Sequence, residues 1–249
     1  MVKRPIHRLG ADLPKPEYDE LAEESIITIH CNDEVVVRLL ASPFELGDLA
    51  YGHIRCEGRG SIDSLTVEGT EVFINGIVRN RPSEDILTAA CGACTTGDIS
   101  IPNQIVGNSQ VLRGNLKEMI LEMKNNQPWF QATGGMHAAA LFDEEGNLLL
   151  LREDIGRHNA FDKVIGGALR NGLQAKIIGL SGRIGWELVA KGVRSGVEII
   201  FAVGAISSAA ESLARASGMT LVAFASSERP AVIGDLSRII DKPSLDRID

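Results

Sequence analysis

The sequence predicts an α/β protein with a mixed sheet and flanking helices, joined to a smaller part that is mostly β. After residue 131, short apolar runs alternate with helical patterns, which is typical of strand–helix–strand units with parallel pairing. Before it, apolar runs are separated by tight-turn pairs, as in hairpins. The run Ile199–Val203 has no polar alternation, as expected of a strand covered on both faces.

Three parts follow from these patterns: a lead-in arm at residues 1–24, a β-rich part at 25–130, and an α/β domain at 131–249. The first part holds three prolines and many charges with almost no apolar periodicity. We therefore expect an extended arm or a partly ordered lead-in there.

The β-rich part is expected to contain two pairs of strands. The turn pairs Asn32-Asp33 and Gly69-Thr70 separate the strands of each pair, at 25–31, 34–40, 65–67 and 71–78. Ser42 is expected to cap a helix that has Pro43 in its first turn and runs to about Tyr51. A short amphipathic helix is expected later, over 116–123.

The α/β domain is expected to open with a hairpin and continue with alternating helices and strands. In chain order the segments are strands 137–142 and 148–151, helix 154–169, strand 177–180, helix 186–194, strand 198–203, helix 207–216 and strand 220–225. Short connections between the last strands imply right-handed crossovers and parallel neighbours.

The stretch Thr88–Asp98 carries the clearest chemical motif, a Cys-x-x-Cys pair formed by Cys91 and Cys94. Its small and polar neighbours predict a loop that solvent reaches. One thiol of such a pair depresses the pKa of the other, and the second thiol attacks whatever the first carries. Thiol redox chemistry, metal binding and sulfur carriage all suit this arrangement.

Composition narrows the choice. With 25 Lys and Arg against 33 Asp and Glu, the net charge is −8, so general binding to nucleic acid or to a membrane surface is not expected. We see neither a signal pattern nor a membrane-spanning run, and expect a cytoplasmic protein. Cys31 fits a small buried apolar residue, and Cys56 receives no role.

Zinc is not expected. A structural zinc site needs four ligands, and the chain has a single Cys-x-x-Cys. Zinc deaminases pair His-x-Glu with a later Pro-Cys-x-x-Cys, whereas here His137 is followed by two alanines and the cysteine pair comes first. A structural role is favoured for His137.

Two turns after predicted parallel strands could hold phosphate. They contain Ser181, Gly182 and Arg183 after the first strand, and Gly204, Ala205 and Ser207 after the next. The helices that follow present free amides, and an arginine adds a charge-assisted bond. The alternative is that both glycines only allow tight turns, and the residues leave this open.

A charged stretch at 152–159 lies at a strand-to-helix junction. We expect Asp154 to cap the helix. Arg157 and His158 then fall in the first turn, where a cation is unfavourable beside the helix dipole, and this placement indicates an anionic ligand. Asp162 is expected to pair with His158 one turn later.

Taken together, several segments resemble the formate dehydrogenase accessory sulfurtransferases, the FdhD family. The matching stretches are Ser42–Gly52, Cys91–Cys94, Gly135–Leu141, Glu153–Ala160, Ser181–Arg183 and Gly218–Leu221. They span about residues 25–228, and the run Glu-Asp-Ile-Gly-Arg-His-Asn is the most specific of them.

The resemblance implies a cytidine-deaminase-like fold without zinc, and a homodimer. Members carry sulfur from a cysteine desulfurase to the molybdenum cofactor, in its bis(molybdopterin guanine dinucleotide) form, before insertion into apo formate dehydrogenase. By position, Cys91 would carry the persulfide and Cys94 would be its partner. The family's cofactor-binding segment falls on Phe224, Ala225, Ser226, Ser227, Glu228 and Arg229.

The resemblance therefore predicts a sulfurtransferase. We place its guanine dinucleotide at the carboxyl ends of the parallel strands, with His158 and the Phe224 segment as neighbours, because parallel strands put their following loops on one edge of the sheet. Two departures from the family pattern keep other functions open: Thr95 replaces a glycine, and an arginine after Phe224 is absent. The alternatives are a non-catalytic cofactor-binding chaperone and a dithiol oxidoreductase.

Overall fold

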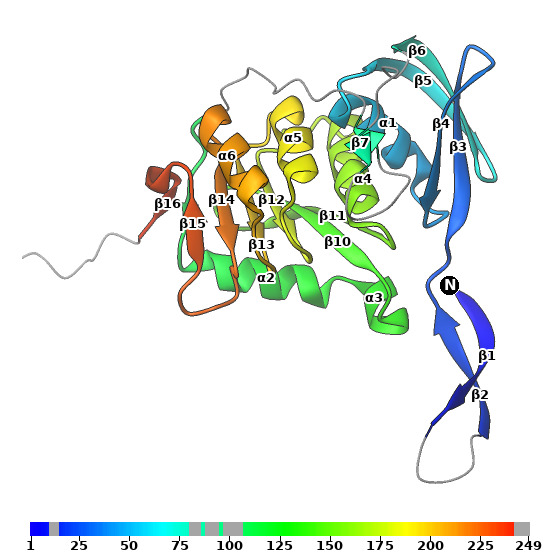
Figure 1. Ribbon diagram of the computed structural model, residues 1–249, viewed down its shortest axis with the longest axis horizontal. Helices are drawn as coiled ribbons and strands as arrows, with labels where there is room; N and C mark the ends of the chain where they lie inside the picture. The colour runs from blue at the N-terminus through cyan, green and yellow to red at the C-terminus, as the bar shows by residue number, and fades with distance from the viewer. Residues whose placement is uncertain (10–14, 80–85, 88–94, 97–106, 242–249) are drawn as a thin grey trace, which may run out of the picture.

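The computed structural model describes residues 1–9, 15–79, 86–87, 95–96 and 107–241. Its largest element is a sheet of six strands in the order β11-β10-β12-β13-β14-β15 (Figure 1). The strands are β10 (His137–Phe142), β11 (Leu148–Asp154), β12 (Ile177–Leu180), β13 (Ile199–Ala202), β14 (Thr220–Ala223) and β15 (Ala231–Ile233). The middle strands β12, β13 and β14 pair in parallel, which confirms that part of the predicted topology.

Helices cover both faces of this sheet. The helices α4 (Arg157–Arg170), α5 (Trp186–Ser195) and α6 (Ser208–Ser217) pack on one face, and α2 (Asn115–Asn125) packs on the other (Figure 1). Along β13, Ile200 and Ala202 face the three helices while Ile199 and Phe201 face α2. Both sides of the strand are therefore apolar, which explains its lack of alternation.

A smaller sheet of four strands lies beside the large one, in the order β4-β3-β6-β5. Its strands are β3 (Ser25–Cys31), β4 (Glu34–Ala41), β5 (Gly60–Glu68) and β6 (Glu71–Val78). The predicted turn at Asn32 and Asp33 is confirmed, since both residues have positive φ (52° and 66°), as a two-residue hairpin requires. Helix α1 (Leu46–Cys56) covers its apolar face.

Two glycines let α1 cross close to α4. A Cβ atom on Gly52 would lie 1.6 Å from the carbonyl oxygen of Asp162, and one on Gly166 would lie 1.9 Å from that of Asp48. Only glycine fits at either position, so the backbones of α1 and α4 are in direct contact at this crossing. This crossing joins the small sheet to the α/β layer.

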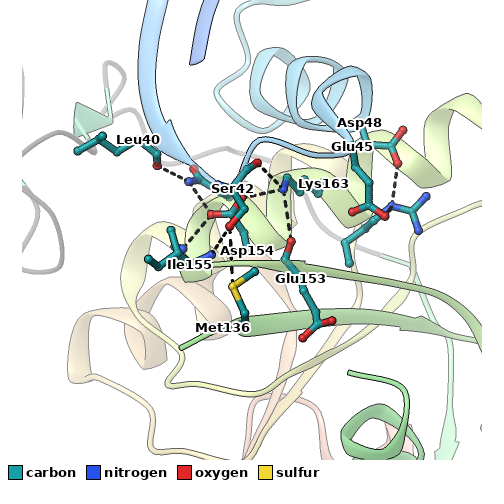
Figure 2. A network of polar contacts seen from close by, with 12 residues as sticks. Leu40, Ser42, Glu45, Asp48, Met136, Glu153, Asp154, Ile155 and Lys163 are labelled. Carbon is teal, nitrogen blue, oxygen red and sulfur yellow. Dashed lines mark hydrogen bonds and ion pairs between the residues drawn. The ribbon is translucent and has the colours of Figure 1, made fainter. Parts of the chain in front are cut away.

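A buried network ties the same two units together (Figure 2). Ser42 is fully buried, its amide donates to Asp154 Oδ2 (3.0 Å), and its hydroxyl accepts from the amide of Ile155 (3.1 Å). Lys163 Nζ lies 2.8 Å from Asp154 Oδ2 and donates to the carbonyl of Ser42 (3.2 Å). Burial lowers the pKa of Lys163, and the pair with Asp154 counteracts this effect.

This network explains two wrong predictions. Ser42 does not cap α1, because the serine bonds to Asp154 at the end of β11. The helix begins later, at Leu46, and runs to Cys56 rather than to Tyr51. Asp154 does not cap α4: it ends β11, and the helix begins at Arg157 after Gly156. The Asp154 carboxylate instead accepts from the amides of Ser42 and Gly156.

The first residues form an antiparallel hairpin of β1 (Val2–Arg8) and β2 (Lys15–Leu21), which extends away from the rest of the chain (Figure 1). The extended conformation was predicted, but the pairing of the two strands was not. Neither face of this hairpin is buried against a core, so its sequence shows no alternation from which strands are predicted.

Several short elements complete the described chain. They are β7 (Ile86–Leu87), β8 (Thr95–Thr96), β9 (Val111–Leu112), α3 (Pro128–Thr133), η1 (Leu236–Arg238) and β16 (Ile239–Ile240). Within the ranges that the structure describes, no helix combines the length and the apolar character needed to cross a membrane. The predicted boundaries at residues 24 and 130 stay predictions.

Candidate functional site at the carboxyl edge of the sheet

The turns after β12, β13 and β14 lie side by side at one edge of the sheet, as their sequence positions predicted. Backbone bonds connect them in series: Gly204 N donates to Gly182 O (3.0 Å), and Phe224 N donates to Gly204 O (3.2 Å). Parallel strands place their following loops at the same edge, and these bonds hold the loops in register.

Gly204, Ala205 and Ser207, which were predicted to contact a ligand, each have a role within the fold. A Cβ atom on Gly204 would lie 2.8 Å from Gly182 O and 3.0 Å from Arg183 Cγ, so glycine is needed for the close approach of two loops. Ser207 caps α6 by accepting from the amide of Ala210 (3.2 Å), and the carbonyl of Ala205 accepts from Ile184 N. Their role toward a cofactor stays a prediction.

A cavity of about 630 Å³ opens between this edge and the helices α2 and α3. Two predicted site residues, Ser181 and Ser226, line it. The other lining residues are largely apolar, with Lys117, Lys124 and His137 among them. An apolar cavity with a few polar groups is typical of a ligand site.

The segment Phe224–Arg229 lies between this cavity and a second one of about 380 Å³, lined in part by Ala225, Ser227 and Glu228. Phe224 has φ of 52°, an uncommon conformation for a residue with a side chain, and the residue is 49% exposed. Ala225 is buried, and its amide donates to the carbonyl of Ala202. An exposed aromatic residue in a segment that borders two cavities suits contact with a planar group.

Cations without a carboxylate partner gather at this edge. In the described range 107–241, carboxylates pair with Lys117, Arg152, Lys163, Lys176 and Lys191, among others. Four cations that border the edge have no carboxylate within ion-pair distance among the described residues: Lys124 in the cavity wall, Arg157 at the start of α4, Arg183 after β12 and Arg229 after β14. In a chain of net charge −8 this concentration indicates an anionic ligand.

His137 stands among these groups. Ser181 Oγ accepts from the amide of Ala138 (2.9 Å) and lies 3.4 Å from His137 Nδ1. Burial and then the nearby Arg157 lower the pKa of His137. The ring is therefore neutral at pH 7 and serves as a hydrogen-bonding group in the cavity wall.

His158 is buried near the first turn of α5. Its Nε2 lies 3.8 Å from Glu187 Oε2 and has no hydrogen-bond partner among the described residues. The neighbouring His158 holds the pKa of Glu187 below its usual range. The predicted pairing of His158 with Asp162 is wrong, since the Asp162 carboxylate contacts Lys191 (2.8 Å) and His53 (3.3 Å) instead.

Three residues that line the cavity were not among the predicted site residues. His137 was expected to be structural, and Lys117 and Lys124 were not considered. The two lysines lie seven residues apart on α2, which places them on one face of a helix. That spacing is readable from the sequence, but the position of α2 against the sheet edge is not.

The predicted thiol pair lies outside the described residues, so nothing is stated of the geometry of Cys91 and Cys94. The adjoining Thr95–Thr96 forms a two-residue strand paired with Ile86–Leu87, although the stretch was predicted to be loop throughout. The other two thiols, of Cys31 and Cys56, are buried. Burial raises the pKa of Cys56 well above its usual value, which keeps that thiol protonated.

Comparison with known proteins places these features in one family. A family model described as the FdhD/NarQ family matches residues 22–240. The "Sulfur carrier protein FdhD" of Sulfurisphaera tokodaii is 34% identical over 224 residues, covering 84% of this chain and 87% of that protein. The protein of the same name from Mycobacterium tuberculosis is 34% identical over 253 residues, covering 89% and 92%.

A solved structure shares the fold. The crystal structure of a protein assigned as a formate dehydrogenase accessory protein, from Desulfotalea psychrophila, superposes with a TM-score of 0.83. It is 23% identical, and the match covers 96% of this chain and 99% of the other. At that identity the likeness establishes the mixed α/β architecture.

Proposed function

Because this chain belongs to the FdhD/NarQ family, we propose that it is a sulfur carrier that accepts sulfur as a persulfide on Cys91 and delivers it to the molybdenum cofactor for formate dehydrogenase. The cofactor is cargo in its bis(molybdopterin guanine dinucleotide) form, held at the carboxyl edge of the large sheet. The sulfur donor is a cysteine desulfurase, the recipient is apo formate dehydrogenase, and the carrier acts as a homodimer.

The observation that supports this function best is the set of unpaired cations at the sheet edge. A guanine dinucleotide brings a diphosphate, which needs positive charge and free amides. Lys124, Arg157, Arg183 and Arg229 supply the charge without a competing carboxylate. The exposed residue Phe224 and the adjoining cavities suit the planar parts of the cargo.

The cysteine pair supplies the transfer chemistry. The Cys91 thiolate attacks the terminal sulfur of the donor's persulfide, a new S–S bond forms on Cys91, and the donor's cysteine leaves as a thiol after taking up a proton. Attack by the Cys94 thiolate on Cys91 Sγ then forms a Cys91–Cys94 disulfide and releases the terminal sulfur as sulfide to the cargo. The released sulfur carries the two electrons that the two cysteines lose.

Mass spectrometry after incubation with a cysteine desulfurase and free cysteine tests this function. We expect one added sulfur on Cys91, which Cys91→Ala abolishes and Cys94→Ala retains. Cys31→Ala is the control, since that thiol is buried and is expected to take no sulfur. Sulfur uptake by Cys91→Ala at the level of the parent contradicts the assignment.

The double variant Cys91→Ala, Cys94→Ala separates sulfur carriage from the chaperone alternative. A sulfur carrier without both thiols fails to mature formate dehydrogenase. Full maturation by the double variant would instead identify a binding chaperone. A dithiol oxidoreductase would form a stable Cys91–Cys94 disulfide and take no sulfur from the desulfurase. Redox titration that finds no such disulfide would exclude it, and added sulfur on Cys91 in the mass spectrum would favour the carrier.

A further inference from the structure

We propose that the amino edge of the large sheet carries the docking surface for the sulfur donor, formed by two apolar pockets that share Leu169 and by the cations at their rim. The pockets fit apolar side chains of the donor, and the cations fit carboxylates beside them. We call this region the donor surface. It rests on the proposed function for the identity of the partner, and it adds the place where that partner binds.

The two pockets, of about 260 and 240 Å³, adjoin each other at the end of α4. Leu169 lines both and is 46% exposed, although it is a large apolar residue. One pocket reaches the loop before β12 and the end of α5, and the other reaches α1 and β5. The further apolar lining residues are Ile165, Leu173 and Ala175 in the first pocket, and Tyr51, Ile54 and Ile62 in the second. An exposed apolar residue between two apolar pockets is typical of a surface that contacts another protein.

The donor surface lies at the edge where the parallel strands begin, opposite the edge assigned to the cargo. Lys176, in the first pocket, comes directly before β12. The helices α4 and α5 end here, at Arg170 and Ser195. Helix α1 ends here too, since Cys56 Sγ lies 3.4 Å from Ser195 Oγ. A partner at this surface therefore does not compete with the cargo for space.

The stretch that carries the cysteine pair is attached to the fold at this same edge. On the entering side, the amide of Arg79 donates to the carbonyl of Arg59 (2.7 Å), and Arg59 Nε donates to the carbonyl of Arg79 (3.1 Å). Arg59 follows directly after the end of α1. On the returning side, the amide of Ser109 donates to the carboxylate of Glu198, just before β13. A partner at the donor surface thus binds at the edge to which both ends of the thiol-bearing stretch are attached, which favours the sulfur donor as that partner.

The charges of the donor surface indicate an acidic partner. The residues that line the two pockets include two cations, Arg55 and Lys176, and no acid. Among the described residues, neither Arg55 nor the exposed Arg79 has a carboxylate within ion-pair distance, and Lys176 lies 3.5 Å from Glu198. In a chain of net charge −8, exposed cations beside an apolar surface favour a partner that presents carboxylates. A second copy in a two-fold contact would instead place these cations against each other, which is unfavourable.

Calorimetric titration of a cysteine desulfurase into the full-length protein, at low and at high salt, tests the donor surface. The double variant Arg55→Glu, Arg79→Glu should weaken binding roughly tenfold at low salt and less at high salt, because salt screens exposed charges. It leaves the backbone bonds of Arg79 in place. Leu169→Ser should weaken binding at both salt concentrations, because it removes an apolar contact. The matched control is Arg38→Glu, which reverses an exposed arginine on β4 and should bind as the parent does.

Sulfur loading from two sources shows whether the surface acts through docking. With the desulfurase, the double variant should raise the KM for this protein donor roughly tenfold and leave kcat unchanged, since both thiols are intact. With glutathione persulfide, a small donor that needs no docking surface, the double variant should load Cys91 at the rate of the parent. Equal losses with both sources would indicate a general defect and would overturn the inference.

Three further results bear on the donor surface. Unchanged desulfurase affinity in the double variant and in Leu169→Ser, or no binding of the desulfurase by the parent, would overturn it. A change of sedimentation coefficient in Leu169→Ser, with unchanged desulfurase affinity, would overturn it in favour of a contact between copies. Binding as expected, together with no sulfur on Cys91 from either source, contradicts the carrier function and supports the surface. Normal sulfur loading with an unchanged KM in the double variant contradicts the surface alone.

Discussion

Lys163 and Asp154 form an ion pair of 2.8 Å in which neither side chain has any solvent exposure. The lysine belongs to α4 and the aspartate ends β11, and both also bond to Ser42 at the end of the small sheet. A buried charge that keeps its partner is tolerated, whereas one that loses its partner is strongly destabilising. The free energy of unfolding should therefore depend strongly on keeping both members of this pair.

Asp154→Asn should therefore lower the free energy of unfolding by about 3–5 kcal/mol, because it leaves the Lys163 ammonium buried without a counter-charge. Urea denaturation followed by circular dichroism measures the change. The control is Glu211→Gln, which breaks an exposed pair with Arg215 on α6 and should cost less than about 1 kcal/mol. Equal losses in the two variants would show that burial of the pair is unimportant.

Gly52→Ala should destabilise the protein by about 1–3 kcal/mol or more, because the added methyl group collides with the backbone of α4. The control is Gly114→Ala before α2, where no atom lies within 4 Å of an added Cβ. Thermal unfolding compares the two. A melting temperature of Gly52→Ala equal to that of the control would contradict the close crossing of α1 and α4.

Acid should weaken the fold through Asp162. Burial alone would raise the pKa of this carboxyl, but Lys191 and His53 overcome it and lower the pKa from 3.8 to about 2. Since the folded pKa lies below the unfolded one, the contribution is complete above 3.8 and is lost as the pH falls toward 2. A shift of this size corresponds to about 2 kcal/mol.

Asp162→Asn should consequently flatten the pH dependence of stability in that window, and also cost stability at neutral pH, because the buried Lys191 then relies on Glu57 alone (2.7 Å). Urea midpoints between pH 2 and pH 7 measure both effects. A variant with the same acid slope as the parent would assign the slope to other carboxyls.

Arg183→Ala should weaken GDP binding roughly ten- to a hundredfold, since a charge-assisted phosphate contact contributes about 1.5–3 kcal/mol. Sulfur loading of Cys91 should persist. Arg215→Ala serves as the control, because it removes an exposed arginine on α6 away from the strand ends. An unchanged GDP affinity in Arg183→Ala would move the nucleotide site to another part of the chain.

The sequence predicted the order of the α/β layer well, since strands covered on both faces, such as Ile199–Ala202, are apolar without interruption. The sequence also predicted that Gly182, Gly204 and Phe224 lie at one edge of the sheet, because the loops that follow parallel strands all emerge at the same edge. The cytidine-deaminase-like comparison, by contrast, stays an expectation from the resemblance.

The errors arose where tertiary contacts override local signals. Ser42 and Asp154 are both favourable capping residues, yet each is used in a bond between units 112 positions apart in the sequence. A single sequence does not show such a bond. The cation cluster was only partly visible for the same reason: Lys124 reaches the site from α2, on the other face of the sheet from Arg157.

The separation of 112 positions between Ser42 and Asp154 also has a consequence for synthesis of the chain. A ribosome adds about 5–20 residues per second, so the acceptor for the Ser42 amide emerges roughly 6–20 seconds after the serine itself. During that interval the small sheet and α1 are made before α4, and the side of α1 that carries Gly52 has nothing to pack on. We therefore expect the nascent chain to be most prone to aggregation before residue 163 has left the ribosome, because the contacts of Lys163 with Asp154 and Ser42 connect the two parts of the chain.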